Sequence, residues 1–364
     1  MRWLVVHPGA GWSVADVHNG WVEALRALGE DVAEYNLNHR IQFFTSARFE
    51  TGETGEHGET VFRRACTDTP TALNMAAENI WAACYSWWPD VVLAVSAFFT
   101  PPHLLQVMRD RGHKVVLLHT ESPYQDDEQL IRAQHANLNL VNDPVNIGRY
   151  RELGPAEYMP HAWRPQVHYP GPGRPELKSD FCFVGTGFDS RIRFFEQMAA
   201  HLGGVDVLLG GGWPGLRKDS PVRDWLLDES MATGDDLRDL FEMTLVDNDQ
   251  TAEFYRAAKT GINFYRRESE DAHAGEGWAI GPREVEMAAT GLWFARDPRG
   301  ESDELFPMMP AYSGPEEAAQ LVRWALAHDS EREKAAAKAR EAVADRTFEA
   351  NARRLLRLLD NQKG

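Results

Sequence analysis

The sequence predicts an α/β fold of two domains that face each other across a cleft, each with a parallel sheet covered by helices. Short apolar runs alternate with amphipathic segments through residues 1–160, a pattern typical of strands buried on both faces. Four prolines interrupt this pattern between residues 164 and 178, and the alternation begins again after them. Ligands of open parallel sheets bind beyond the carboxyl ends of the strands, so two such sheets predict a cleft for two substrates.

The first predicted domain spans residues 1–163. Its apolar runs predict strands at residues 3–7, 32–35, 91–95, 115–119 and 138–141. Helices are expected at residues 18–28 and 144–153, because Gly29 and Gly154 provide stop signals. A polar, glycine-rich stretch breaks the rhythm between residues 40 and 65. We expect a mobile surface insertion there, which is a candidate lid.

The second predicted domain, residues 179–329, follows a semi-rigid, proline-rich connector at 164–178. Its strands are expected at residues 181–185, 205–209, 245–246, 261–265 and 292–295, and its helices at 190–202, 251–258 and 282–290. The last segment, residues 330–364, has alternating charges and a leucine-rich end. We expect docking helices with one solvated face there.

Composition narrows the classes of partner. The net charge of −17 argues against DNA or an anionic membrane as the main partner, because both are polyanions. No apolar run approaches the roughly 18 residues of a spanning helix, so no membrane insertion is expected. Three widely spaced cysteines fit reduced thiols in a cytoplasmic protein. Twelve tryptophans give a carbohydrate or nucleotide ligand some weight, since aromatic faces stack on sugars and bases.

The most informative motif runs from Gly281 to Gly291. Pro282 suits the first turn of a helix, and Gly291 suits the left-handed position after the last turn. The start of this helix favours an anion. Glu286 lies one turn further on, where a carboxylate can accept hydrogen bonds from vicinal hydroxyls, so phosphate and hydroxyls together indicate a nucleotide-sugar site. Arg283 faces either a diphosphate or solvent, and the sequence favours neither.

A second glycine turn, Gly185-Thr186-Gly187, lies between a predicted strand and helix. It is either a tight turn or a place where the backbone approaches a phosphate, and Arg191 at the helix start is a candidate diphosphate contact. Ser190 replaces the last glycine of the dinucleotide fingerprint, so a nicotinamide or flavin site is not the default. Three aromatic residues can stack on the donor or form core: Trp213, Tyr265 and Trp278.

Acceptor and catalytic candidates come from the first domain. Gly9, Ala10 and Gly11 follow the first strand and can cradle the acceptor or a phosphate, although a bare glycine turn looks the same. A base that accepts the proton of an acceptor hydroxyl must be a carboxylate or an imidazole. The strand at 115–119 aims His119 and Glu121 at the cleft, so we place them first. The remaining candidates are Asp16 and His18 near the first strand, and His161 for a sugar or phosphate contact.

A metal site is not expected. Asp247-Asn248-Asp249 matches a metal-binding D-x-D pattern, but its place before a helix favours capping. No other cluster has ligand spacing. We therefore expect neither a metal nor another cofactor, and positive side chains and helix N-termini would stabilise a leaving diphosphate.

The order and spacing of several motifs over about 300 residues are similar to those of a known superfamily. The motifs are Glu121–Pro123, Asn142–Asp143, Met159–Trp163, Phe183–Gly187 with Arg191, Gly210–Trp213, Ala257–Asn263, Pro282–Gly291 and Asp303–Phe306. The chain resembles the GT-B glycosyltransferases, and most closely the spore-coat-maturation (CgeB-type) group.

This resemblance implies two Rossmann-like domains, with the nucleotide-sugar donor in the C-terminal one and the acceptor mainly in the N-terminal one. It also implies that the helices of residues 330–364 cross back to the N-terminal domain. Glu286 falls on the family's ribose-binding glutamate. Trp278 stands where retaining relatives often carry an earlier glutamate, so the stereochemical outcome does not follow.

The sequence therefore predicts a hexosyltransferase-like enzyme that moves a sugar from a UDP-, GDP- or TDP-activated donor to a hydroxyl acceptor. The acceptor can be a small molecule, a glycan, a protein or modified DNA. A degenerate protein that only binds nucleotides or glycans is the main alternative, because of Trp278. Transfer to a hydroxylated DNA base, and an epimerase or phosphorylase of the same fold, also stay open. The oligomeric state does not follow from the sequence.

Overall fold

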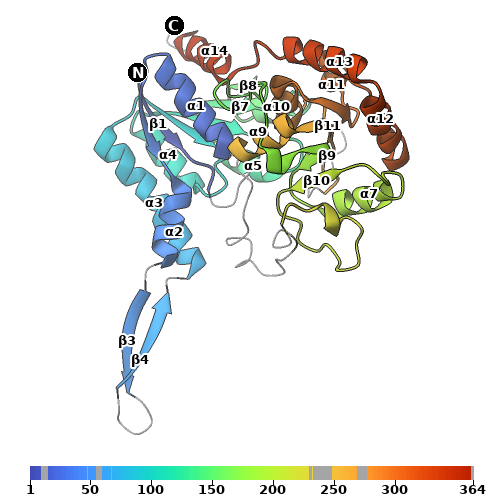
Figure 1. Ribbon diagram of the computed structural model, residues 1–364. Helices are drawn as coiled ribbons and strands as arrows, with labels where there is room; N and C mark the ends of the chain where they lie inside the picture. The colour runs from blue at the N-terminus through green and yellow to red at the C-terminus, as the bar shows by residue number, and fades with distance from the viewer. Residues whose placement is uncertain are drawn as a thin grey trace. The chain divides into compact units, whose positions relative to one another are not determined.

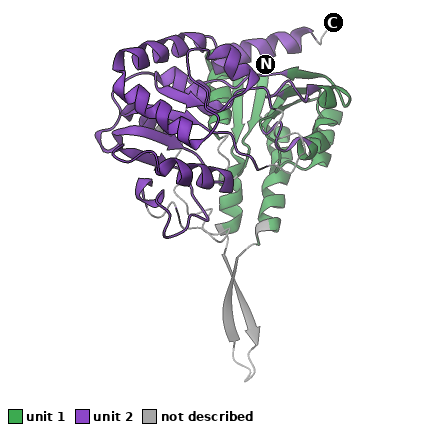
Figure 2. Ribbon diagram, turned by 90° about the vertical axis from the view of Figure 1, so that its right-hand side faces the viewer, with its two compact units in different colours: residues 1–120, 127–140, 148–157 green, residues 121–126, 141–147, 158–364 purple. Residues whose placement is uncertain are grey.

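The structure is a computed structural model that describes residues 1–9, 15–46, 48–54, 60–66, 68–228, 232, 248–268 and 277–361. The chain divides into two compact units (Figure 2). Unit 1 comprises residues 1–120, 127–140 and 148–157, and unit 2 comprises residues 121–126, 141–147 and 158–364. Unit 1 contains a six-stranded sheet and a separate two-stranded sheet, and unit 2 contains a four-stranded sheet. The predicted α/β fold with two Rossmann-like sheets is confirmed.

Unit 1 is built on a six-stranded sheet with the order β2-β1-β5-β6-β7-β8. Figure 1 labels β1, β7 and β8 of this sheet. Strand β1 pairs in parallel with β2 and β5, and β5 pairs in parallel with β6. The strands are β1 (Arg2–Val6), β2 (Asp31–Tyr35), β5 (Val91–Val95), β6 (Lys114–His119), β7 (Leu138–Val141) and β8 (Ala156–Tyr158). The helices are α1 (Ala15–Ala27), α3 (Thr69–Trp87), α4 (Pro102–Asp110), α5 (Asp126–Ala133) and α6 (Ile147–Arg151). All five predicted strands of this domain are present, because their uninterrupted apolar runs suit a sheet that is buried on both faces.

The predicted mobile insertion at residues 40–65 has regular structure where it is described. Helix α2 (Leu37–Ser46) is followed by β3 (Arg48–Thr54) and β4 (Thr60–Cys66), which pair with each other in antiparallel register. This hairpin was not predicted from the sequence, and the mobility and lid role of the insertion stay predictions. Its glycines and acidic residues hid strand-forming residues such as Val61 and Phe62.

Unit 2 contains a four-stranded parallel sheet with the order β10-β9-β11-β12. Its strands are β9 (Ser179–Val184), β10 (Val207–Gly210), β11 (Ala258–Asn263) and β12 (Trp293–Arg296). Its first helices are α7 (Asp189–Ala199), α9 (Asn248–Ala257), α10 (Pro282–Thr290), α11 (Gly300–Leu305) and α12 (Pro315–Ala327). Large aromatic side chains, among them Phe183, Phe195 and Trp293, fill its core. The strand expected at 245–246 lies outside the described residues.

The chain ends in helices α13 (Asp329–Ala342) and α14 (Phe348–Asn361). Helix α13 packs against α10 and β12 within unit 2. Near α14, the Asn351 amide donates to the carbonyl of Pro160 at 2.8 Å, and Trp163 N–H donates to the carbonyl of Arg346 at 3.0 Å. Pro160 and Trp163 belong to unit 2, like the helices that they contact. The predicted crossing of residues 330–364 to the first domain therefore stays a prediction, as do the predicted domain limits. No helix in the described part of the chain combines the length and hydropathy needed to cross a membrane.

Candidate functional site

The candidate donor site lies at the carboxyl ends of the strands of unit 2. The turn after β9 leads into α7, residues 264–268 follow β11, and α10 begins beside them. Ligands of parallel sheets bind at this edge. Arginines are frequent in these segments, and a further one follows β12: Arg191, Arg266, Arg267, Arg283 and, after β12, Arg299.

Helix α10 begins and ends where its sequence predicts. Gly281 is extended before the first turn, and Gly291 closes the helix with a φ of 80°, in the left-handed region that favours glycine. The N–H of Gly281 donates to the Tyr265 hydroxyl at 3.3 Å. One amide at the helix start is thus already engaged by the protein.

The segment before α10 is held by two buried carboxylates that the sequence analysis did not select. Asp143 accepts the N–H groups of Trp278 at 2.9 Å and Ala279 at 3.0 Å. Glu301 accepts the N–H of Ile280 at 2.8 Å. Burial raises the pKa of Asp143, although these hydrogen bonds favour its charged form. Hydrogen bonds from main-chain N–H groups to these two carboxylates therefore hold residues 278–280 in place before the helix begins.

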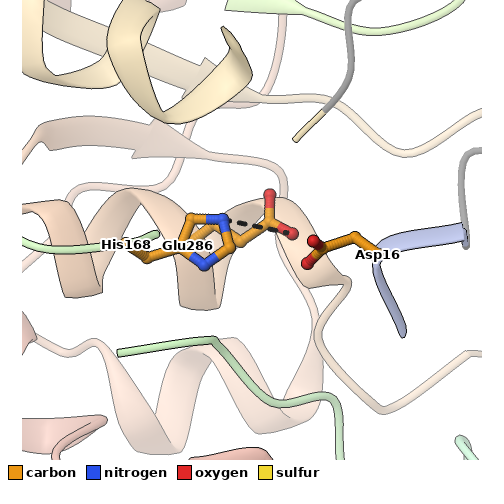
Figure 3. Close-up of side chains that lie close together, drawn as sticks. All are labelled: Asp16, His168 and Glu286. Carbon is orange, nitrogen blue, oxygen red and sulfur yellow. Dashed lines mark ion pairs between the residues drawn. The ribbon is translucent and has the colours of Figure 1, made fainter. Parts of the chain in front are cut away.

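Glu286 is buried, with 6% of its surface exposed, so the alternative of a surface helix residue is excluded. Its Oε1 lies 4.0 Å from Nε2 of His168 (Figure 3). Burial, together with the charges of Arg164 and Arg256, lowers the pKa of His168 to about 3. His168 is consequently neutral at physiological pH, and the contact is not a true ion pair.

Arg283 is bound to the ends of two strands rather than extended into solvent. Its Nε donates to the carbonyl of Val184 at 2.9 Å, and Nη1 donates to Oδ1 of Asn263 at 3.1 Å. Its guanidinium lies 4.7 Å from the centre of the Phe183 ring. Gly185 has a φ of 159°, and a Cβ on it would lie 2.6 Å from Nη2 of Arg283. The missing side chain at Gly185 makes room for this guanidinium.

Arg191 is buried beside Arg283. It donates from Nη1 to the carbonyl of Thr186 at 2.8 Å and from Nη2 to that of Phe264 at 3.1 Å. Its Nε has no hydrogen-bond partner within the described part of the chain. Burial and the nearby charge of Arg283 push the pKa of Arg191 well below its ordinary value. Two guanidinium groups bonded to uncharged oxygens form a site that an anion would stabilise.

The start of α7 already holds an anionic group from the protein. Ser190 donates its N–H and its hydroxyl to the two carboxylate oxygens of Glu268, each at 2.7 Å. Burial acts to raise the pKa of Glu268, but the bonds from Ser190 outweigh it and hold the pKa below its ordinary value. This helix start therefore binds a carboxylate in the absence of a ligand.

Two residues that were predicted to contact the donor, Trp213 and Gly187, pack against each other in the protein. The Trp213 ring is 0% exposed, packs against Phe183 and Phe195, and donates from Nε1 to the carbonyl of Gly210. It is a core residue, and the stacking interpretation is not retained. A Cβ on Gly187 would lie 2.5 Å from this ring, so Gly187 allows the tryptophan to approach the turn.

Tyr265 belongs to a buried polar network instead of presenting a free face. Its hydroxyl bonds to the Glu284 carboxyl group, and the guanidinium of Arg299 lies 3.8 Å from its ring centre. Glu284 is 0% exposed and also accepts a 2.7 Å bond from the Ser302 hydroxyl. Burial raises the pKa of Glu284 to about 7, against the opposing effect of these hydrogen bonds and of Arg299. Sequence analysis missed Glu284, because an acidic residue in a first helical turn is ordinary.

His119 occupies the interior of unit 1. It is 1% exposed, its Nε2 lies 2.8 Å from Oδ1 of Asn139, and its ring lies 4.8 Å from that of Tyr150. Burial lowers its pKa to about 4, despite the bond to Asn139. These contacts are those of a structural histidine, and we do not retain it as a candidate base.

The other candidates of unit 1 gather around β1 and α1. Asp16 and His18 are buried on α1, and the His18 ring lies 5.1 Å from that of His7. Burial lowers the pKa of His18. Gly9 has a φ of 123°, and a Cβ on it would collide with the Phe99 ring. Ala10 and Gly11 lie outside the described residues.

Glu121 and His161 are grouped with unit 2. Oε2 of Glu121 lies 2.7 Å from Nη2 of Arg266. Burial raises the pKa of Glu121, and Arg266 opposes this shift. The Asn142 amide lies 3.3 Å from Nε2 of His161. The pKa of His161 is lowered to about 4 by burial and the charges of Arg346 and Arg299, so His161 is a neutral hydrogen-bonding group.

The structure describes only part of the D-x-D pattern at residues 247–249, for which the sequence allows metal binding or helix capping. Asp247 and the side chains of Asn248 and Asp249 lie outside the described residues. Asn248 and Asp249 are the first two residues of α9, whereas an N-cap residue precedes its helix, so the capping role stays a prediction. The absence of an essential metal stays a prediction.

Comparisons with known proteins agree with this architecture. Residues 191–357 match the family model described as "Glycosyl transferase-like". Sucrose-phosphate synthase from Thermosynechococcus elongatus has a TM-score of 0.62 at 14% identity, over 100% of this chain and 99% of that one. Anabaena HepE in complex with UDP has a TM-score of 0.58 at 9% identity, over 99% of both chains.

A third similar structure is a putative UDP-N-acetylglucosamine 2-epimerase from Listeria monocytogenes. Its TM-score is 0.59 at 11% identity, over 99% of this chain and 96% of that one. No curated protein matches the chain by sequence. At such identities the solved structures show the fold, which is GT-B. The family match and the fold together support a glycosyltransferase.

Proposed function

We propose that this protein transfers a sugar from a nucleoside-diphosphate sugar to a hydroxyl acceptor. The observation that carries the proposal is the buried Glu286 on α10, whose first turn also presents Arg283 to the ends of β9 and β11. The glycosyl transferase-like match over residues 191–357 contains all of these groups except β9. UDP in the complex of the similar HepE structure makes a uridine nucleotide the first donor to test.

The proposed roles follow from charge. The Glu286 carboxylate accepts the two vicinal hydroxyls of the ribose. Arg191 and Arg283 neutralise the diphosphate, whose negative charge grows as the sugar leaves. In this proposal the arginines replace a metal ion, and no cofactor takes part.

Glu121 and Asp16 stay the candidate bases. The raised pKa of Glu121 makes its carboxylate a better proton acceptor, whereas its bond to Arg266 must loosen before it can accept a proton. We also propose a CgeB-type grouping and a cytoplasmic location. The second rests on the free, buried thiols of Cys84 and Cys182.

The test uses purified protein with UDP-, GDP- and TDP-glucose, and follows release of the nucleoside diphosphate. With UDP- or GDP-glucose, Glu286→Gln is expected to lower kcat/KM about 100-fold, because the two hydrogen bonds from the ribose hydroxyls to a charged group are weakened. Glu333→Gln, an exposed glutamate on α13, is the matched control and should leave the rate unchanged. Failure of UDP, GDP and TDP to bind in calorimetry would overturn the proposal.

A protein that binds nucleotide sugars without chemistry is the second candidate. Trp278 replaces the earlier glutamate, and its N–H bond to Asp143 gives this position a structural task. Tight binding of a nucleotide sugar with neither transfer nor hydrolysis would favour this reading. An epimerised sugar among the products would instead favour the activity named for the Listeria structure. Binding to duplex DNA with a steep salt dependence would revive a DNA acceptor.

A further inference from the structure

His168 lies in the proline-rich segment between residues 164 and 178 and is 0% exposed. Its N–H donates to the carbonyl of Arg164 at 2.8 Å, which folds the chain into a single turn. The side chain closes the same turn, because Nδ1 accepts the N–H of Arg164 at 3.2 Å. Main-chain atoms thus fix both the position and the orientation of the ring.

The bond at Nδ1 also fixes which nitrogen carries the ring proton. A nitrogen that accepts a hydrogen bond is unprotonated, so the proton of the neutral ring is on Nε2. Nε2 has no hydrogen-bond partner in the part of the chain that the structure describes. It lies 4.0 Å from Oε1 of Glu286 (Figure 3). The histidine therefore presents a neutral N–H toward a carboxylate.

Helix α9 anchors the segment on both sides of this histidine. Arg256 donates from Nη1 to the carbonyls of Val167 at 2.7 Å and Tyr169 at 3.4 Å. Its guanidinium also lies 4.5 Å from the centre of the Tyr169 ring. These contacts hold the main chain on both sides of His168.

We propose that His168 is a positioning residue for Glu286, whose carboxylate it orients toward the two vicinal hydroxyls of a nucleotide ribose. This inference rests on the proposed function. A shift of about 1 Å by either side chain brings Nε2 and Oε1 to hydrogen-bond distance. A neutral donor suits the task, since a protonated histidine would pair with the carboxylate and compete with the ribose hydroxyls.

Two substitutions separate the two ring nitrogens. His168→Asn can keep an acceptor for the N–H of Arg164, but its side chain is too short to donate to Glu286. His168→Gln places an amide N–H near the position of Nε2. Thermal unfolding of both variants, compared with the wild type, reports whether they fold.

The readout is the preference for ribose over 2′-deoxyribose. UDP, GDP and ADP are first titrated into the wild type by calorimetry, and the tightest ligand is compared with its 2′-deoxy form. We expect the wild type to prefer the ribose form at least tenfold. In His168→Asn, affinity for the ribose form should fall about tenfold, and affinity for the 2′-deoxy form should change less than about twofold. His168→Gln should recover most of the preference.

Equal losses for both sugar forms, or an unchanged preference in His168→Asn, would overturn the inference and leave the proposed function intact. Absence of binding to the wild type would overturn both. If neither variant folds, ¹⁵N NMR of histidine in the wild type decides the question. A proton on Nε2 of His168 that moves downfield when the nucleotide binds supports the inference, and an unmoved resonance contradicts it.

Discussion

The two parallel sheets carry different polar groups near the carboxyl ends of their strands. In unit 1 these groups are the histidines His7, His18 and His119, whose pKa values are all lowered, chiefly by burial. In unit 2 they are arginines, two of which, Arg191 and Arg283, bond uncharged oxygens. Neutral imidazoles exchange hydrogen bonds without a net charge, whereas guanidinium groups keep theirs. The three histidines of unit 1 are therefore neutral, and the two arginines of unit 2 carry charge. Unit 1 also has the buried Asp16, and the buried Arg132 donates to the carbonyls of Phe98 and Thr100.

This difference supports the proposal that unit 2 binds the nucleotide-sugar donor and unit 1 binds the acceptor. A nucleoside diphosphate carries its charge to the edge that holds arginines, and an acceptor hydroxyl is uncharged. Three experiments can break or sharpen the comparison.

The largest expected effect is the acid sensitivity of His119 in unit 1. Its folded pKa of about 4 lies below its ordinary value of 6.5, so the unfolded chain takes up the proton first. The contribution of the neutral His119 to the free energy of unfolding is complete above pH 6.5. About 3 kcal/mol of it is lost as the pH falls toward 4. His119→Gln keeps a donor for Asn139 and should lose less stability over this range. Urea unfolding at pH 7 and pH 4.5 checks this, and equal losses in the two proteins would contradict it.

An effect of similar size and opposite direction is expected for Glu284 in unit 2. Its folded pKa of about 7 lies above its ordinary value of 4.5, so the folded state holds the proton longer. Its stabilisation is complete below pH 4.5 and is lost as the pH rises through 7, by about 3 kcal/mol. Glu284→Gln should abolish this loss. Amide hydrogen exchange of peptides from α10, measured between pH 5 and 8 and corrected for intrinsic rates, tests it. A variant with the wild-type pH dependence would exclude a neutral Glu284.

The smallest of the three effects is on ligand affinity. Arg283→Met should weaken UDP binding about tenfold to 100-fold, because a charge-assisted bond to the diphosphate is lost, and should leave uridine binding unchanged. Arg193→Met, an exposed arginine on α7, is the matched control. Equal weakening of UDP and uridine would mean that Arg283 only supports the fold, and the contrast between the two edges would lose its functional meaning.

Local sequence patterns were sufficient to predict most of the fold. Glycine at 281 and 291 and proline at 282 defined α10, and apolar runs defined the strands, since both signals act between neighbours in the sequence. The hairpin of β3 and β4 was missed because glycines and acidic residues concealed its strand-forming residues. The role of Trp213 stayed open, because the sequence does not distinguish a core tryptophan from a stacking one, and its complete burial identifies it as core.

The site was only partly accessible from the sequence. Glu286, Arg283 and Arg191 lie in recognisable motifs. His168 and Asp143 act on residues more than 100 positions away, and no local spacing marks such pairs. Glu284 differs from any first-turn acid only through the tyrosine and serine that enclose it.

The hydrogen bonds from Arg256 to the carbonyls of Val167 and Tyr169 have a consequence for protein engineering. Every amino acid supplies a main-chain oxygen, so these two hydrogen bonds do not depend on the side chains at 167 or 169, although the packing of Arg256 on the Tyr169 ring does. A different linker sequence can therefore be grafted across residues 164–178 without losing these bonds, provided that the imidazole at 168, the aromatic ring at 169 and the glycine at 173 are kept.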